Sequence, residues 1–384
     1  MPPLSPTQAA VLARDVYLVN DPNPVRRIAA LENLPSGYSP EPVLKGRTGL
    51  GPGVLSNLGY LAVRPESKEA IIAIRGTIPT FPPDVATDAL LMDLSPVTDG
   101  GVHAGFLRAW SSVVERVDEA LPAHALGGVT VHCIGHSLGG ALATLAADHL
   151  SRRGARVFLY TFGAPRVGGA GFCQQLTARV GPDRIFRVYH PADPVTMVPL
   201  FPFTHVPWNR SGCAIRCGPN ERISVSRHSM EGYVQFMSGV SFAQLRQNGP
   251  QRLTDRQIEH CLATVKAGGW VQNWGARAAE LIGIALDWVL RKLLEGGLAL
   301  LQPFFAAGVS ALDVLAWALH RATQVAERTA WYVEAIIQAI LQFIGRAWDR
   351  TKSLTYEFLR WALETAAREI RRLVASALHA LPRI

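Results

Sequence analysis

The sequence of 384 residues lacks the features that mark several large protein classes. Its N-terminal residues do not form a basic segment followed by an apolar run, so we expect no secretory signal peptide. Five cysteines, a small and odd number, exclude a dense disulfide framework. No zinc-finger or RNP pattern supports nucleic-acid binding, although the net charge is +8. The charge therefore favours a different anionic partner, the phosphates of a membrane surface.

Long charge-free runs are also scarce. Gly296–Leu312, the most apolar part of the C-terminal region, contains no charged residue, but it contains Pro303 and three glycines. A membrane-spanning helix needs about 20 apolar residues. The composition favours a broken hairpin or a buried helix pair over a transmembrane span.

Metal-binding patterns are incomplete. Cys213 and Cys217 lie close together in a polar loop, with His205 upstream. A local disulfide or a metal site is one interpretation of this loop. No ligand set with established zinc spacing completes it, which favours two free thiols. We predict no metal and no cofactor.

The most informative segment that is present is Gly135–Gly140, with the sequence GHSLGG. The β-branched run Val129–Ile134 precedes it, and the alanine- and leucine-rich segment Ala141–Leu150 follows. This is the strand, tight turn and helix that a nucleophile elbow requires. Flanking glycines allow the sharp turn without Cβ clashes and leave the Ser137 hydroxyl exposed at the end of the strand. Ser137 is therefore the candidate nucleophile.

The first two thirds of the chain alternate short β-rich runs with helical patterns, which indicates βαβ units and a mostly parallel sheet covered on both faces. One long helix is expected over Phe106–Leu121. The expected strands are Leu58–Val63, Ala70–Ile74, Val129–Ile134, Val157–Phe162 and Arg184–Tyr189.

After about Asn248 the pattern changes, and from Trp270 onward alanine, leucine, tryptophan and arginine dominate. Apolar residues fall at helical spacing, with polar residues opposite them, which predicts a set of amphipathic helices. A chain of this length exceeds the usual single core. We predict an α/β domain over residues 1–248 and an all-α amphipathic domain over residues 249–384. In the predicted all-α domain, one apolar stripe at helical spacing comprises Val333, Ile336, Ile337, Ile340, Ile344, Ala347 and Trp348, opposite Glu334, Gln338, Gln342 and Asp349. The pattern continues with Leu354, Phe358 and Trp361.

A serine nucleophile needs a histidine base and an acid that orients the base. Asp193 follows the expected strand Arg184–Tyr189, at the edge of the sheet where sites of α/β proteins form. Asp183 precedes that strand, and Asp148 lies on the helix after Ser137, too close to the nucleophile.

For the base, the residue spacing leaves three candidates open. His228 lies in a loop that enters an expected helix, whereas His190 and His205 are its rivals. Spacing alone does not decide among them, because a lone histidine is more often structural than catalytic.

Residues 58–238 resemble the class 3 (fungal-type) lipases, a branch of the α/β-hydrolases that includes plant phospholipase A1 enzymes. Six blocks occur in the order of that family, and together they are far more specific than the serine motif alone. They are Ile74–Thr77, Val102–Phe106, Gly135–Gly140, Tyr160–Gly168, Asp193–Pro199 and His228–Tyr233.

The resemblance implies an α/β-hydrolase fold, with Ser137 as nucleophile, Asp193 as orienting acid and His228 as base. It implies that the oxyanion is bound by Thr77 and by the N–H of Leu138, in keeping with the two donors that acyl transfer requires. Asp93 matches the aspartate that bonds the Thr77 hydroxyl. Between them, Ile78–Met92 matches the family lid, but its prolines depart from a short helical lid. His103 and Arg166 lie in matching blocks, and we expect them to pack and to form hydrogen bonds rather than to act in catalysis.

The function expected from this resemblance is hydrolysis of glycerolipid acyl esters, by a phospholipase A or an acylglycerol lipase. The alternative is a membrane-binding or membrane-permeabilising protein whose helical tail carries the activity. Compact fungal lipases lack such a tail. Combined with the absence of a signal peptide, it favours a cytoplasmic enzyme or a bacterial effector exported by a dedicated secretion system. We expect peripheral membrane association through the tail, and an effector would imply an inhibitor or immunity protein.

Overall fold

A computed structural model describes most of the chain. The described residues are 3–41, 43–48, 54–76, 94–95, 101–121, 126–199, 203–208, 212–218, 221–249, 254–267, 284–285, 288–289, 311–346 and 353–379. Thr77, the expected lid Ile78–Met92, Asp93 and the apolar run Gly296–Leu312 up to residue 310 therefore lie outside the described residues, as do Ala347, Trp348 and Asp349.

The N-terminal part is built on a mixed sheet that has eight strands within the described residues. The first strands pair antiparallel, and from β4 onward every neighbouring pair is parallel. This arrangement confirms the expected α/β-hydrolase fold. In spatial order the strands are β1 (Ser39–Pro40), β3 (Val54–Arg64), β4 (Glu69–Ile74), β7 (Thr130–His136), β8 (Arg156–Phe162), β10 (Ile185–Tyr189) and β12 (Cys213–Ala214), with β2 (Leu44–Thr48) beside β3.

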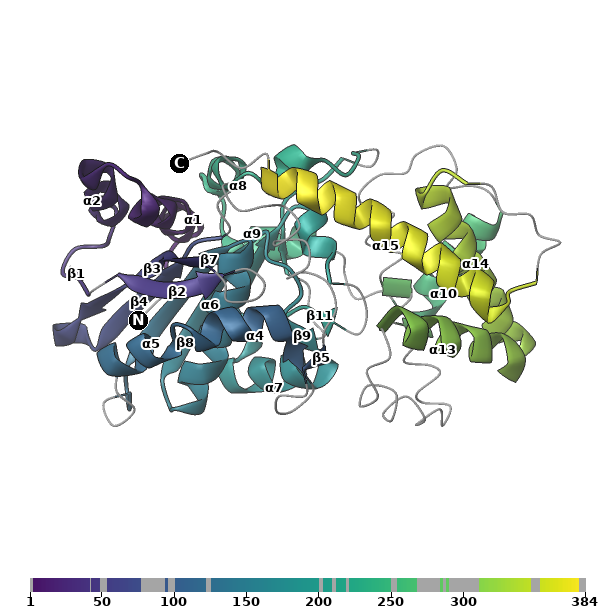
Figure 1. Ribbon diagram of the computed structural model, residues 1–384, viewed down its shortest axis with the longest axis horizontal. Coiled ribbons are helices and arrows are strands. Elements are labelled where there is room, and N and C mark those ends of the chain that lie inside the picture. The colour runs from purple at the N-terminus through teal and green to yellow at the C-terminus, as the bar shows by residue number, and fades with distance from the viewer. Residues whose placement is uncertain are drawn as a thin grey trace.

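Helices cover both faces of the sheet (Figure 1). Every residue of the central strands β4 and β7 is buried, as expected for parallel strands with both faces covered. On one face lie α4 (Ala104–Ser111), α5 (Val114–Ala120), α6 (Leu138–Arg152) and α7 (Ala170–Val180). On the other lie α1 (Pro6–Asp15), α8 (Met230–Met237) and α9 (Phe242–Asn248), while α2 (Pro24–Glu32) follows α1.

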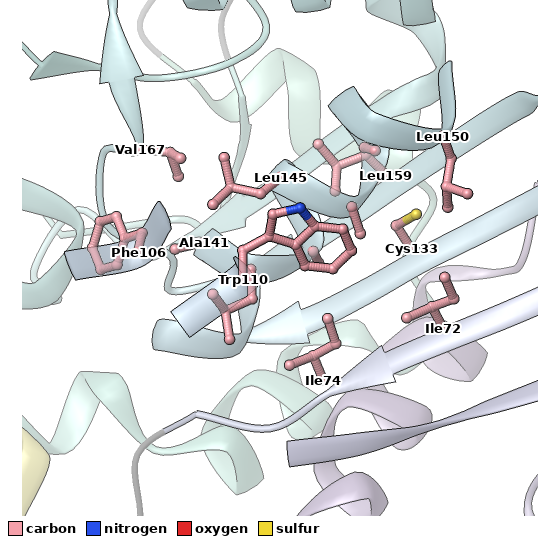
Figure 2. Close-up of a cluster of buried hydrophobic side chains, with 14 of the residues drawn as sticks. Ile72, Ile74, Phe106, Trp110, Cys133, Ala141, Leu145, Leu150, Leu159 and Val167 are labelled. Carbon is pink, nitrogen blue, oxygen red and sulfur yellow. The ribbon is translucent and has the colours of Figure 1, made fainter. Parts of the chain in front are cut away.

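Alternate residues of each strand enter different cores, because successive side chains point to opposite faces of a sheet. Ile72 and Ile74 pack with the α4 and α6 side chains, whereas Ile71 and Ala73 pack with α1 and α8. Figure 2 shows the first of these cores, where the Trp110 ring from α4 lies among leucines of α6 and β8 and isoleucines of β4. The two cores hold the strand ends in place from both faces of the sheet.

The expected strands all form, with ends that differ by a few residues. The single helix expected over Phe106–Leu121 is wrong: it is broken into α4 and α5 at Ser112 and Val113. The Ser112 hydroxyl donates to the carbonyl of Ala109 and accepts the N–H of Arg47, so a contact with β2 ends α4 there. A serine that bonds nearby backbone in this way competes with helix continuation.

A second, small sheet joins four short strands near the end of the main sheet. It consists of β5 (Leu94–Ser95), β6 (Val102–His103), β9 (Gly168–Gly169) and β11 (Phe203–Thr204), all antiparallel. His103 packs against the rings of Phe106 and Phe203, as expected of a packing residue.

The C-terminal part consists of helices, as the amphipathic pattern predicts. Val333, Ile336, Ile337 and Ile340 are buried in one cluster with side chains of the neighbouring helices. The described helices are α10 (Asp255–Lys266), α13 (Ala311–Val325), α14 (Glu327–Phe343) and α15 (Tyr356–His379). In this described part of the chain no helix combines the length and apolarity needed to cross a membrane.

One expectation for the tail is wrong in detail. Gln338, placed on the polar face of its helix, is buried, and its amide donates to the carbonyl of Val265 in α10. Periodicity within one helix does not contain such a contact with a neighbouring helix. Trp361 stacks on Phe358, so the two share a face as expected, and the Trp361 side chain is 38% exposed.

Helix α15 runs from the helical part to the α/β part (Figure 1). Leu359 and Leu363 in its first half are buried with α13 and α14, whereas Val374 and Leu378 near its end are buried in the hydrolase core. The packing of this helix thus crosses the predicted domain boundary between residues 248 and 249. The boundary itself stays a prediction.

Candidate active site

Ser137 occupies a sharp turn between β7 and α6. Its φ of 56° is left-handed, a strained conformation for a serine, and its N–H donates to the carbonyl of Phe162. The turn closes tightly, since a Cβ on Gly135 would lie 2.1 Å from the carbonyl oxygen of Gly139. Only glycine fits at this position, which explains why the serine is bracketed by glycines. The turn presents Ser137 at the carboxyl end of β7.

Two hydrogen bonds connect Ser137 to His228 and His228 to Asp193. The Ser137 hydroxyl lies 2.9 Å from Nε2 of His228, and Nδ1 of His228 lies 2.9 Å from Oδ2 of Asp193. All three residues are at most 1% exposed, so the expectation that the glycine turn leaves the Ser137 hydroxyl exposed is wrong for this structure. With the proton of the imidazole on Nδ1, Nε2 is free to accept the serine proton, which is the geometry of a nucleophile with its general base.

Asp193 is held by donors on both of its oxygens. It caps the 3₁₀ turn η5 (Pro194–Met197), where Oδ1 accepts the N–H of Val195 at 2.9 Å. Oδ2 also accepts the hydroxyl proton of Tyr233 at 2.8 Å. Burial, followed by the charge of Asp193, raises the pKa of Tyr233 well above its ordinary value, so the phenol stays a donor. The acid therefore faces the imidazole in one fixed orientation.

His228 ends the 3₁₀ turn η6 (Val225–His228), and His136 supports it from β7. Nε2 of His136 lies 2.9 Å from the carbonyl of His228, to which it donates, and Nδ1 lies 2.7 Å from the Tyr17 hydroxyl. Burial lowers the pKa of His136 well below its ordinary value, so the ring is neutral. A neutral ring that donates through Nε2 accepts through Nδ1, and Tyr17 is then the donor.

Sequence reasoning missed Tyr17 and the role of Tyr233. Tyr233 lies in the block that contains His228, on the first turn of α8, so it was available as a candidate donor. Tyr17 follows α1, far from the other site residues in sequence, and carries no local signal.

Part of the expected oxyanion site is described. Leu138 is the first residue of α6, so its N–H belongs to the opening turn of a helix, where amide groups have no intrahelical acceptor. Thr77 lies outside the described residues, but its neighbour Gly76 is close to the nucleophile. A Cβ on Gly76 would lie 2.9 Å from the Cβ of Ser137. The chain thus passes beside the nucleophile immediately before Thr77.

The rival residues have other partners in the structure. Nε2 of His190 faces Glu221 at 3.5 Å, and Nε2 of His205 lies 2.8 Å from the carbonyl of Thr196. Asp183 pairs with Arg246 at 3.2 Å, and Asp148 pairs with Arg152 and Arg179 on the surface of α6.

The other residues of the family blocks have structural contacts. The Arg166 guanidinium donates to the carbonyl of Pro199. Burial lowers the pKa of His103 to about 4, and its ring nitrogens have no hydrogen-bond partner in the described part of the chain.

All five cysteines are free thiols, which confirms that interpretation for Cys213 and Cys217. One group within the described residues, His190, Cys217 and Glu221, places its ligand atoms within 4.8 Å of one another. Nδ1 of His190 accepts the N–H of Ala192 at 3.0 Å, so the ring proton is on Nε2, the atom that faces the other two. A metal-bound histidine needs the opposite arrangement, with its second nitrogen protonated. The group fits hydrogen bonding and does not fit a metal ion.

Residues 71–203 match the family model described as Lipase (class 3). The chain is 35% identical over 169 residues to a secreted mono- and diacylglycerol lipase 1 of Fusarium solani, covering 42% of this chain and 47% of the relative. It is 29% identical over 181 residues to the rice phospholipase A1 EG1, covering 37% of this chain and 40% of the relative. The chain spans about half the length, or less, of these curated relatives.

Solved lipase structures are also similar. A lipase of Rhizopus microsporus var. chinensis is 28% identical, with a TM-score of 0.39 and coverage of 54% of this chain and 72% of that one.

Proposed function

We propose that the protein is a serine hydrolase of glycerolipid acyl esters, because residues 71–203 match the family model described as Lipase (class 3). The observation that carries the proposal is the hydrogen-bonded chain from the Ser137 hydroxyl through His228 to Asp193. The relatives whose names mention mono- and diacylglycerols or phospholipase A1 support the substrate class.

The geometry supports acyl transfer through a covalent intermediate. Ser137 Oγ attacks the ester carbonyl while Nε2 of His228 takes its proton, and Asp193 stabilises the imidazolium that forms. The N–H of Leu138, with Thr77 as second donor, binds the oxyanion. His228 then returns the proton to the leaving alcohol. Water, activated by the same histidine, releases the fatty acid from the acyl-enzyme.

A lipid panel tests the proposed function. Wild type and Ser137→Ala are incubated with mono-, di- and triacylglycerols and with phospholipids, and the products are identified by mass. We expect free fatty acid with a deacylated glycerol or a lysolipid from wild type and none from the variant. Fatty acid released equally by both proteins would overturn the proposal. The products also identify the preferred lipid and the acyl position cleaved.

Membrane association is the second part of the proposal, and the helical part supports it. Trp361 is partly exposed, and the Arg346 guanidinium lies 5.3 Å from its ring centroid. Tryptophan favours the membrane interface and arginine favours anionic headgroups. We assign the C-terminal helices as a peripheral attachment to anionic membranes.

A membrane-permeabilising activity of these helices is the alternative function that the same exposed tryptophan and arginines favour. The two functions differ in their need for Ser137. If the helices permeabilise membranes by themselves, dye leakage from anionic liposomes persists in Ser137→Ala. If leakage follows hydrolysis, the variant causes none.

We also propose, from the expectation raised by the appended helices, that the protein is a bacterial effector exported by a dedicated secretion system. Such an effector requires a cognate inhibitor or immunity protein in the producing cell. Periplasmic production would then arrest growth for wild type and not for Ser137→Ala. Normal growth with active enzyme present would exclude the effector role.

A further inference from the structure

Four polar side chains meet beside the triad without being part of it. Oε1 of Glu221 lies 3.5 Å from Nε2 of His190 and 2.7 Å from Nη2 of Arg227. Its other oxygen, Oε2, accepts the N–H of Gly218 at 3.1 Å. The Cys217 thiol also bonds to Glu221 and is buried beside Ala192. Glu221 is therefore the centre of this cluster.

The two partners of Glu221 belong to the two segments that carry the acid and the base. His190 and Asp193 share one turn, in which the N–H of Asp193 donates to the carbonyl of His190 at 2.9 Å. Arg227 directly precedes His228 in η6. Among the described residues, the contacts of Glu221 add to two other links between these turns, the backbone bond from the N–H of Ser224 to the carbonyl of Ala192 and the bond between His228 and Asp193.

Protonation states make the contacts complementary. His190 carries its proton on Nε2, because Nδ1 accepts the N–H of Ala192, and burial lowers the pKa of His190. Partial burial of Glu221 opposes its ionisation, but the Gly218 N–H and the proximity of His190 and Arg227 outweigh this and lower the pKa of Glu221. Near neutral pH the carboxylate thus pairs with the Arg227 guanidinium, while the protonated Nε2 of the neutral His190 ring faces the same oxygen at 3.5 Å without a hydrogen bond.

The cluster is shielded enough for its charges to matter. The His190 side chain is 2% exposed, that of Glu221 21% and that of Arg227 38%. The ring of Phe236 from α8 lies 5.9 Å from both the His190 ring and the Arg227 guanidinium. Fully exposed ion pairs contribute little, whereas a partly buried pair between two turns restricts their relative motion.

We propose that Glu221 is a positioning residue for the triad: by joining His190 to Arg227, its carboxylate sets the orientation of the His228 imidazole relative to Asp193. The expected effect on kcat rests on the proposed function, whereas the effect on the orientation of the His228 imidazole does not. Since the reacting groups are displaced only slightly when the link is lost, we expect a loss of kcat on the order of tenfold, below the 10²-fold that a 1 Å misplacement costs.

Glu221→Gln is the direct test, because the amide keeps an oxygen for Gly218 and removes the charge. With 4-nitrophenyl butyrate as substrate, kcat should fall about tenfold while KM stays within about twofold, the pattern of a lost transition-state contribution. Arg227→Gln should give the same result from the more exposed partner. The matched control is Asp183→Asn, which removes a surface ion pair with Arg246 and should leave kcat unchanged.

The second measurement needs no substrate. The proton between Nδ1 of His228 and Asp193 gives a low-field proton NMR resonance in wild type, and this resonance should shift or broaden in Glu221→Gln and Arg227→Gln but not in Asp183→Asn. An unchanged resonance, or an unchanged kcat, in folded Glu221→Gln overturns the positioning role. If wild type shows the resonance but hydrolyses no ester, the proposed function fails while the positioning role is still tested.

Discussion

Single residues outside the triad restrict how it can move. The Tyr233 hydroxyl and the Val195 N–H fix the two oxygens of Asp193, and His136 holds the backbone of His228. Each of these buried polar groups has a hydrogen-bond partner, as the cost of an unpaired buried group requires. The site is thus ordered by tertiary contacts before substrate arrives.

The proposed oxyanion donor Thr77 gives the first prediction at this scale. If the hydroxyl donates to the oxyanion, Thr77→Ala should lower kcat on the order of 10²-fold with little change in KM, because the lost bond forms only in the transition state. Steady-state kinetics on a soluble ester measure this directly. A loss below about threefold would leave only the backbone N–H of this residue in that role.

His103 gives the second prediction, on stability against pH. Burial lowers its folded pKa to about 4, whereas the unfolded value is about 6.5. Between these values the unfolded chain binds the proton and the folded chain does not, so stability falls as the pH drops from 7 toward 4. The contribution lost between pH 7 and pH 5 is about 2 kcal/mol.

Urea unfolding of wild type and His103→Leu at both pH values measures this contribution. The ring nitrogens of His103 have no partner among the described residues, so leucine removes the titration without breaking a hydrogen bond. The loss of stability on acidification should be smaller in the variant by about 2 kcal/mol, while other buried histidines such as His132 cancel in the comparison. An equal loss in both proteins would contradict the assignment.

At the scale of elements, strands and the elbow were predictable from sequence, because β-branched runs and glycines encode them locally. Ser137 was predictable in the same way, whereas His228 was singled out among the histidines only by the resemblance to the family blocks, because residue spacing left His190 and His205 open. The break in the helix at Ser112, the burial of Gln338 and the donor from Tyr17 were not predictable. Each depends on a contact with an element distant in sequence.

Helix α15 gives a prediction with a control in the same element. The helix contacts η5, which follows Asp193, and η6, which contains His228. Leu378, near the end of the helix, packs in the core that also contains Val195 of η5, whereas Leu359 packs in the helical cluster. Leu378→Ala and Leu359→Ala should each lower the free energy of unfolding by about 2–5 kcal/mol. Only Leu378→Ala should also lower kcat of the folded enzyme. Equal losses of kcat in both variants would remove this link between helix and site.

At the scale of the whole molecule, the hydrolase and the helical part share α15, so a membrane-bound tail would place the site near its lipid. The prediction is that an inactive Ser137→Ala protein with the complete tail binds anionic liposomes better than the same protein ending at residue 269. Binding should weaken with added salt, because part of the attraction is screened Coulomb energy. Flotation of the two proteins with liposomes measures the difference, provided that circular dichroism shows the shortened protein folded. Equal flotation would exclude the membrane role.

In the proposed mechanism His228 activates Ser137 as the nucleophile, and covalent labelling of Ser137 measures this activation. An alkyl fluorophosphonate is added to wild type, His228→Ala and His190→Ala, and the modified residue is located by peptide mass. We expect labelling of Ser137 in wild type and in His190→Ala, and a rate several orders of magnitude lower in His228→Ala, because the residues of a triad act as a unit. Labelling of another residue, or loss of labelling in His190→Ala with labelling retained in His228→Ala, would contradict it.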